Sequence, residues 1–185
     1  MSTLLACLLV LLTGVSSSAQ SEVPVQLQAE LFAKLATYDR NFTKRAGARA
    51  HVLIVTVPRN TQSSLFATGM VSALGRIERV GGLPHEEIII QYAGATALAK
   101  ACESRKAAAV YLGPGLEGEM ARVRAALTGV NVMSIAANPA YVQLGAVLGF
   151  ELSSGKPRIV VNLPQARKQQ VDFRADVLKL MKVYR

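Results

Sequence analysis

Short apolar segments alternate along the chain with segments in which apolar residues recur every three or four positions. The clearest apolar segment is 51–57, a run of mainly β-branched residues that ends at Pro58. Such a run is typical of a strand that is buried on both faces of a parallel sheet. Further apolar runs predict strands at 87–92, 107–112 and 130–135. Periodic segments predict helices at 22–42, from about 61 to 79, at 94–104, and from just after Gly115 through 127.

The segment 140–167 has the pattern of a short helical turn, a β-hairpin and the entry into a helix. Two apolar runs flank Ser153-Ser154-Gly155-Lys156, and Gly155 can take a positive φ without a steric clash. Pro164 suits the first turn of a last helix, which we expect to span about 164–184.

Alternation of strands and helices predicts an α/β fold with right-handed crossovers. We expect three layers: a mostly parallel sheet of about four parallel strands, a C-terminal antiparallel hairpin at the sheet edge, and flanking helices. No linker is long enough to divide the chain, so residues 20–185 are predicted to form a single domain.

The first nineteen residues have the pattern of a secretory signal peptide. Residues 4–12 are an apolar segment, and Ser17 and Ala19 are small residues suited to a cleavage site before Gln20. The segment is shorter than the roughly 20 residues that span a bilayer. The absence of Lys and Arg before it departs from the usual pattern. We expect 1–19 to be removed, leaving an exported domain without stable membrane insertion.

Composition and charge narrow the range of partners. The chain carries 21 Lys and Arg residues against 12 Asp and Glu, a formal net charge of +9, with 5% aromatic residues and no Trp. Proteins that bind single-stranded nucleic acid need aromatic stacking platforms, so we expect no nucleic-acid partner. The basic surface is either solvated or in contact with anionic lipid or an acidic protein.

No motif in the sequence indicates catalysis. There are only two histidines, His51 and His85, and once the signal is removed one cysteine, Cys102, which we interpret as a buried apolar residue. We find no nucleophile elbow, zinc-protease motif or cysteine cluster. The sequence therefore predicts no catalytic residue, no metal and no cofactor, and a hydrolase with an unrecognised site is the least favoured alternative.

One glycine-rich segment resembles a dinucleotide-binding loop. Residues 113–118 match G-x-G-x-x-G and follow a predicted strand. However, that strand is the third and not the first, Pro114 removes an amide donor, and Glu117 would repel an anion. A tight strand-to-helix turn is the favoured interpretation.

Ligands of open parallel sheets bind beyond the carboxyl ends of the strands. The predicted connections there supply candidate ligand- or partner-binding residues: Arg59, Asn60, Gly113, Gly115, Asn138 and Tyr141. Asn138-Pro139 is also an ordinary turn pair, so a structural role for these residues is the alternative interpretation.

The C-terminal half carries a family resemblance. Its residues are Asn138-Pro139-Ala140-Tyr141, Gly145, Val147, Phe150, Gly155-Lys156-Pro157-Arg158-Ile159, Asn162-Leu163 and Ala166-Arg167. In this order they resemble the YfiR-like periplasmic proteins, and residues 31–41 are similar to a divergent form of that family's first helix. The resemblance implies a bacterial periplasmic protein with one α/β domain.

The best understood members of that family repress a membrane-bound diguanylate cyclase through its periplasmic sensor region, often as dimers. The resemblance therefore implies a regulator in cyclic-di-GMP signalling, a membrane-bound signalling partner and a homodimer. Well-studied members pair cysteines in disulfides, which Cys102 alone cannot do within one chain. Our first hypothesis is a non-enzymatic periplasmic regulator; the alternative is a small solute-binding or transport-accessory module that uses the cleft at the strand ends.

Overall fold

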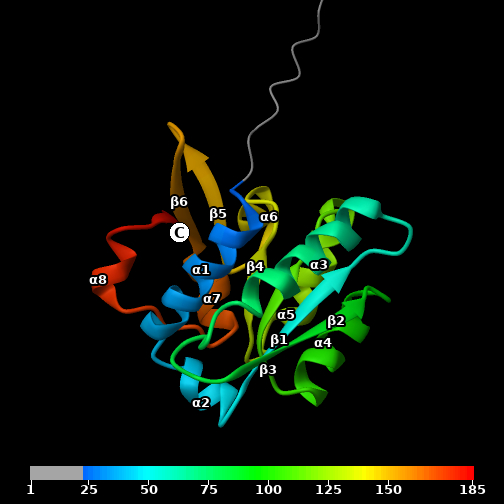
Figure 1. Cartoon of the computed structure of the whole chain (residues 1–185), viewed down its shortest axis with the longest axis horizontal. Coiled ribbons are helices and arrows are strands. Elements are labelled where there is room, and N and C mark those ends of the chain that lie inside the picture. Colours follow the sequence, from blue (N-terminus) through cyan, green and yellow to red (C-terminus); the bar gives the residue numbers. More distant parts are fainter. Residues whose placement is uncertain (1–22) are drawn as a thin grey trace, which may run out of the picture.

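The computed structural model describes residues 23–185 and shows a layered α/β fold around one twisted sheet (Figure 1). The predicted signal peptide, residues 1–19, lies outside the described residues. Within 23–185 the sheet has seven strands in the order β2-β1-β3-β4-β5-β6-β7. The strands are β1 (Ala50–Thr56), β2 (His85–Gln91), β3 (Ala107–Leu112), β4 (Met133–Ala136), β5 (Leu148–Ser153), β6 (Lys156–Asn162) and β7 (Lys182–Tyr184).

Helices cover both faces of the sheet, which confirms the three-layer prediction. On one face lie α1 (Val25–Leu35) and α3 (Thr61–Leu74), and on the other α4 (Ala95–Ser104) and α5 (Met120–Leu127). Shorter helical segments are η1 (Ala36–Tyr38), α2 (Phe42–Ala46), η2 (Glu117–Glu119), α6 (Ala140–Leu144), α7 (Leu163–Lys168) and α8 (Ala175–Leu178).

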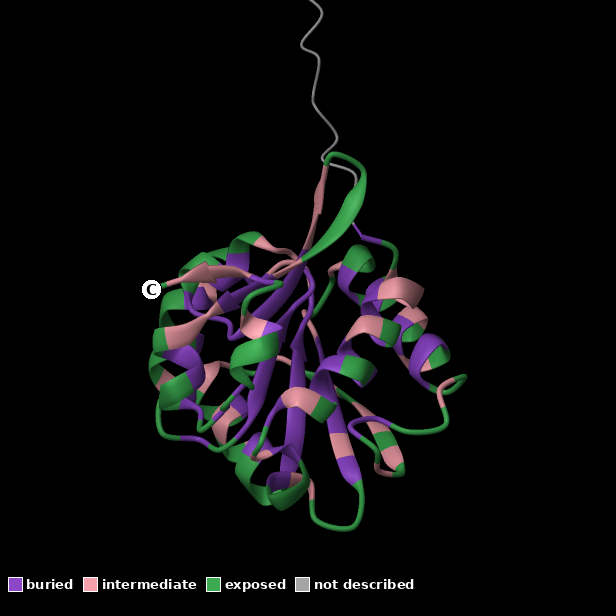
Figure 2. Cartoon of the chain, turned by 90° about the vertical axis from the view of Figure 1, so that its left-hand side faces the viewer, coloured by how far each residue is buried: buried purple, intermediate pink, exposed green. Residues whose placement is uncertain are grey.

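The core is divided into two clusters by the sheet, because successive side chains of a strand point to opposite faces. In β1, Val52 and Ile54 join the cluster under α1 and α3, whereas Leu53 and Val55 join the cluster under α4 and α5. Figure 2 shows the buried central strands between helices whose outer surfaces are exposed. This two-sided burial explains the continuous apolar runs in the sequence.

The parallel part of the sheet is one strand larger than expected. Strands β2, β1, β3, β4 and β5 are parallel, and β6 pairs with β5 as the predicted antiparallel hairpin. Both central residues of its turn, Ser154 (φ 51°) and Gly155 (φ 73°), have positive φ, as the twist of a two-residue hairpin requires. The short strand β7 lies beyond β6 and forms the sheet edge.

The prediction of one long helix over 164–184 is wrong. Helix α7 ends because Gln170 takes a left-handed conformation (φ 56°) and the Val171 N–H donates to the Ala166 carbonyl at 2.8 Å. The chain then runs beside the segment after η1: the Arg40 N–H donates to the Asp172 carbonyl at 2.9 Å. The Arg174 N–H donates to the Tyr38 carbonyl at 3.0 Å. These long-range backbone bonds replace helical ones.

The predicted first helix is also interrupted. It becomes α1, η1 and α2, with an isolated bridge between Asp39 and Phe173 in the break. In the break, the Asp39 carboxylate forms an ion pair with Arg45, and both side chains are buried. Arg45 also donates to the side chain of Asn131 at 2.7 Å and to the Gln170 carbonyl at 3.1 Å. This network joins α2 to the segment after α7 and to the start of β4.

Candidate functional site

The six candidate residues lie on three neighbouring connections at one end of the sheet. Strands β1, β3 and β4 are adjacent and parallel, so their carboxyl ends meet at the same edge. The connection after β1 carries Arg59 and Asn60, the one after β3 carries Gly113 and Gly115, and the one after β4 carries Asn138 and Tyr141.

Asn60 and Gly115 are in direct contact. The Asn60 Oδ1 accepts from the Ser63 N–H at 2.9 Å and caps α3. Gly115 has φ 93°, and a Cβ atom there would lie 2.3 Å from the Asn60 Nδ2. The glycine thus lets the connection after β3 pack directly on the helix cap.

Gly113 likewise allows close packing, in this case of the connection after β3 against the end of β1 and the buried Ser63. A Cβ atom at Gly113 would lie 2.3 Å from the Val55 carbonyl oxygen and 3.1 Å from the Ser63 Oγ. The Ser63 hydroxyl accepts from the Val57 N–H at 2.9 Å and is fully buried. Sequence reasoning missed Ser63, although its place three residues after a capping asparagine was the available signal.

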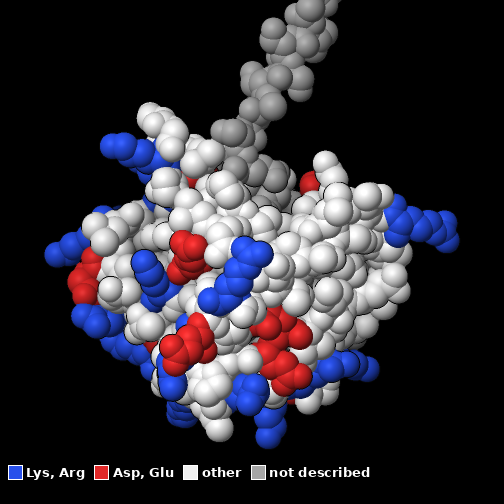
Figure 3. All heavy atoms as spheres, viewed as in Figure 1, with Lys and Arg blue, Asp and Glu red and all other residues white. Residues whose placement is uncertain are grey.

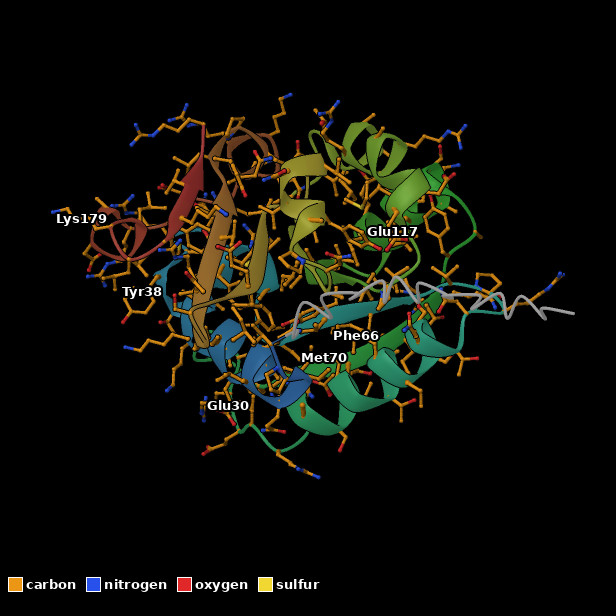
Figure 4. All side chains as sticks on the ribbon, turned by 90° about the horizontal axis from the view of Figure 1, so that it is seen from above. Glu30, Tyr38, Phe66, Met70, Glu117 and Lys179 are labelled. Atoms are coloured by element: carbon orange, nitrogen blue, oxygen red, sulfur yellow. The ribbon has the colours of Figure 1, made fainter. Side chains whose placement is uncertain are left out.

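Tyr141 joins the connections after β3 and β4. Its ring is fully buried, and its hydroxyl donates to the Glu117 Oε1 at 2.7 Å and accepts from the Leu116 N–H at 3.0 Å. Burial, reinforced by the Glu117 carboxylate, raises the pKa of Tyr141 well above its ordinary value. Figure 4 shows Glu117 on the far side of the sheet from Phe66 and Met70, which lie on α3. Glu117 was considered only as a residue that would repel an anion.

Asn138 and Arg59 do not join this network. The Asn138 Oδ1 accepts from the Ala140 N–H at 3.0 Å, a turn within its own connection. Arg59 is exposed with φ 58°, and its side chain makes no hydrogen bond or salt bridge to any of residues 23–185. Four of the six residues therefore serve to pack the strand ends together, and a ligand-binding role for the six stays a prediction.

A separate group of three polar residues, Tyr92, Glu119 and Arg122, lies along the same edge. The Tyr92 hydroxyl, on the connection after β2, donates to the Glu119 Oε2 at 3.0 Å, and Arg122 holds the other oxygen of that carboxylate at 2.7 Å. Burial, with the Glu119 carboxylate second, raises the pKa of Tyr92 to about 12. Tyr92 therefore keeps its proton, and its role as a hydrogen-bond donor, to a higher pH than an ordinary tyrosine.

A second candidate surface is the outer side of α3. The helix contains no charged residue in its 14 positions, and Leu65 is 69% exposed on it. Beside it, Ile89 of β2 is 50% exposed and lies on the same side of the sheet, because it pairs with Ile54 of that core cluster. Figure 3 shows the resulting charge-free area over α3, in contrast to the charged surface around it. Sequence analysis did not single out this face.

Residues 23–185 contain no cluster of three His, Cys, Asp or Glu side chains placed to hold a metal ion. None of its helices is both long enough and apolar enough to cross a membrane.

Solved structures with a similar fold come from three bacteria. A conserved domain protein from Vibrio cholerae aligns with a TM-score of 0.60 at 14% identity, over 89% of this chain and 62% of its own. An ABC domain in complex with L-Trp from Streptococcus pneumonia aligns with a TM-score of 0.60 at 12% identity, over 87% and 62%. The ligand-free, open structure of CD0873, a substrate binding protein with adhesive properties from Clostridium difficile, gives 0.57 at 15% identity, over 88% and 60%.

These likenesses describe the fold alone. The chain spans about three fifths of the length of each of these proteins. A search of curated proteins found no match. A comparison with models of protein families matches the model described as YfiR/HmsC-like over residues 25–182, nearly all of the described chain.

Proposed function

The chain belongs to the YfiR/HmsC-like family, and on this premise we propose that it regulates a membrane-bound signalling protein from the periplasm by protein–protein contact, without catalysis. A diguanylate cyclase with a periplasmic sensor region is the partner that we propose, which would place the protein in cyclic-di-GMP signalling. Export through the signal segment 1–19 is part of this proposal.

The charge-free face of α3 is the observation that supports a protein partner most directly. The chain carries 21 basic residues, yet α3 has none of them and no acidic residue. The centres of protein interfaces are depleted of charged residues, because a charge that loses its water without a partner is costly. Covering this face with another protein would therefore cost less desolvation free energy than covering the charged parts of the surface.

The neighbouring strand β2 adds a second feature of a contact surface. Among residues 23–185 it pairs only with β1 and is an edge of the sheet. An exposed edge presents backbone N–H and C=O groups that a strand of another chain can pair with. Ile89, half exposed on the α3 side of β2, adds an apolar side chain to this edge. Leu65 lies on the other flank of α3, where it lines a hollow with Val25 and Pro114.

The solute-binding alternative has less support at the strand ends. Asn60, Gly113, Gly115 and Tyr141 are engaged in contacts between the connections, so few of their polar groups remain for a solute there. Two of the proteins of similar fold are described with a ligand or a substrate, but at 12% and 15% identity they support only a shared fold. Formation of a homodimer also remains a proposal, and the same charge-free face is compatible with it.

Affinity capture from envelope fractions tests the proposed function. We expect the native chain to recover a membrane signalling protein, and Leu65→Glu to reduce the recovery by about tenfold or more, because it places an unpaired charge in the contact. Leu180→Glu is the matched control, since Leu180 is 76% exposed and lies outside α3 and β2. Failure of the native chain to recover any such protein at native expression would contradict the proposal.

A further inference from the structure

A basic hollow lies where α5, α6, α7 and β7 come together. Its volume is about 310 Å³. Three cationic residues, Arg124, Lys168 and Arg185, line it, and no Asp or Glu does. A concave wall of one charge sign focuses the electrostatic potential and attracts ions of the opposite sign.

The side chains of these three residues form no ion pair with the protein, although Arg185 also bears the terminal carboxylate of the chain. Within residues 23–185, neither Arg124 nor Lys168 nor Arg185 takes part in a salt bridge, whereas nine such pairs occur elsewhere. Arg122, two residues before Arg124, contrasts with it because it is paired with Glu119 at 2.7 Å. The like charges around the hollow repel each other. A bound anion would reduce this repulsion more than water molecules in the hollow would.

The fold makes room for Arg124 at this place. Gly145, which follows α6, has φ 121°, and a Cβ atom there would lie 2.4 Å from the Cγ and Cδ of Arg124. Only glycine therefore lets the aliphatic part of Arg124 lie against the backbone at the end of α6. The backbone carbonyl of Arg124 also accepts from the Gln165 Nε2 at 3.4 Å, and this bond connects α5 to α7.

Neutral polar groups complete the wall. Gln165 is 2% exposed and lines the hollow from α7. The Gln143 Nε2 donates to the Tyr184 hydroxyl at 2.6 Å, so α6 and β7 are held together across the hollow. Gln143 is exposed and Tyr184 half-buried, so Gln165 is the one buried side chain of the three, and its bond to the Arg124 carbonyl fixes its orientation.

From this arrangement we infer that the hollow binds a small phosphate-type oxyanion. A guanidinium can bind two phosphate oxygens at once, and an ammonium group adds a point charge. The volume is at the low end of the range for ligand sites, which fits a phosphate or phosphomonoester group and not a large ligand. None of the residues that line the hollow belongs to α3 or β2, so this site does not depend on the proposed partner contact.

Calorimetric titration of the chain 20–185 with inorganic phosphate tests the site. We expect saturable binding that Arg124→Gln and Lys168→Gln each weaken by about tenfold, the usual effect of losing one charge-assisted hydrogen bond. Arg122→Gln removes the same charge from the same helix outside the hollow and should leave the affinity unchanged. Circular dichroism verifies that each variant is folded.

Vesicles of equal parts phosphatidylglycerol and phosphatidylcholine distinguish a lipid headgroup from free phosphate. Binding to vesicles but not to phosphate, lost in the Arg124→Gln/Lys168→Gln double variant, would support the site and identify lipid as the source. Binding of phosphate that is lost in the double variant supports a solution ligand. Absence of saturable binding to both probes, or equal loss in Arg122→Gln and Arg124→Gln, would overturn the inference.

Discussion

The Asp39 carboxylate and the Arg45 guanidinium lie 2.9 Å apart, with side-chain exposures of 0% and 2%. Asp39 also accepts the backbone N–H groups of Asn41 and Asp172 at 3.1 and 2.9 Å. Burial lowers the pKa of Arg45, and the Asp39 charge opposes this shift. The pair is thus fully hydrogen-bonded, which is the condition under which two charges can remain inside a protein.

We expect Asp39→Asn to lower the free energy of unfolding by about 3–5 kcal/mol, since Arg45 then remains buried without a counter-charge. The measurement is urea unfolding followed by circular dichroism. Arg40→Gln is the control, because Arg40 and Asp172 form a 3.1 Å pair with side chains 56% and 54% exposed. An exposed pair contributes at most about 1 kcal/mol. Equal losses of unfolding free energy in the two variants would contradict the prediction that the buried Asp39–Arg45 pair contributes more to stability than the exposed pair.

Substitution of Gly115 tests the packing of the strand-end connections. Gly115→Ala places a Cβ atom against Asn60 at a positive φ, so we expect a loss of about 1–3 kcal/mol in unfolding free energy. Gly118→Ala changes the same connection, but nothing lies within 4 Å of the added Cβ. We expect that variant to stay within about 0.5 kcal/mol of the native chain. Thermal and urea unfolding of both variants would reveal the difference; matching stabilities would contradict the close contact.

Removal of the Tyr141 hydroxyl leaves the Leu116 N–H without its acceptor in a buried place. We expect Tyr141→Phe to cost about 1–3 kcal/mol, the penalty for an unsatisfied buried donor. In Tyr38→Phe, the hydroxyl removed makes no hydrogen bond to residues 23–185, so the change should be below about 0.5 kcal/mol. Hydrogen exchange of the Leu116 amide gives a local measurement: it should become faster in Tyr141→Phe alone.

Cys102 is 2% exposed, and burial, followed by the Glu103 charge, raises its pKa to about 12. Because the thiolate is the reactive form, we expect a thiol reagent at pH 8 to label the chain 20–185 only after denaturation. Ala97→Cys, at an exposed position of the same helix, should add one thiol that reacts at once. Rapid labelling of the native protein would disprove burial of Cys102.

The same shift has a consequence for stability at high pH. The unfolded chain loses the thiol proton near pH 9 and the folded chain only near pH 12. Stability from this group is therefore present below pH 9 and is lost as the pH rises toward 12. A Cys102→Ala variant should lack this part of the decline in urea titrations across that interval.

The parts of the fold that depend on local pattern could be predicted from sequence. The segment 107–112 was predicted as a strand and is β3, because all six of its residues are buried and the apolar run has no polar interruption. The cap at Asn60 was predictable for a similar reason, since its partner is only three residues away.

The parts that depend on distant partners could not be predicted. Phe173 and Val177 are four positions apart, a spacing typical of a helix, and both are buried in the structure. Their burial is achieved by a chain that turns at Gln170 and bonds to the segment near Asp39, more than 120 residues earlier. Nothing near Arg45 in the sequence indicates that it is buried in a network with a counter-charge. The basic hollow likewise joins residues of α5, α7 and the chain end, which are far apart in sequence.

The network around Arg45 also constrains the order in which the chain can fold. Arg45 needs the Gln170 carbonyl, 125 positions later in the chain, to complete its hydrogen bonds. A chain that emerges amino end first, from a ribosome or through a translocation channel, carries this arginine solvated until the last segment appears. The segment between α1 and α2 can form its native long-range hydrogen bonds only after residues 170–172 have been synthesised. Fragments that end before that point would lack the Gln170 carbonyl and the Asp172 N–H, so the Asp39–Arg45 pair would be left without its long-range hydrogen-bond partners.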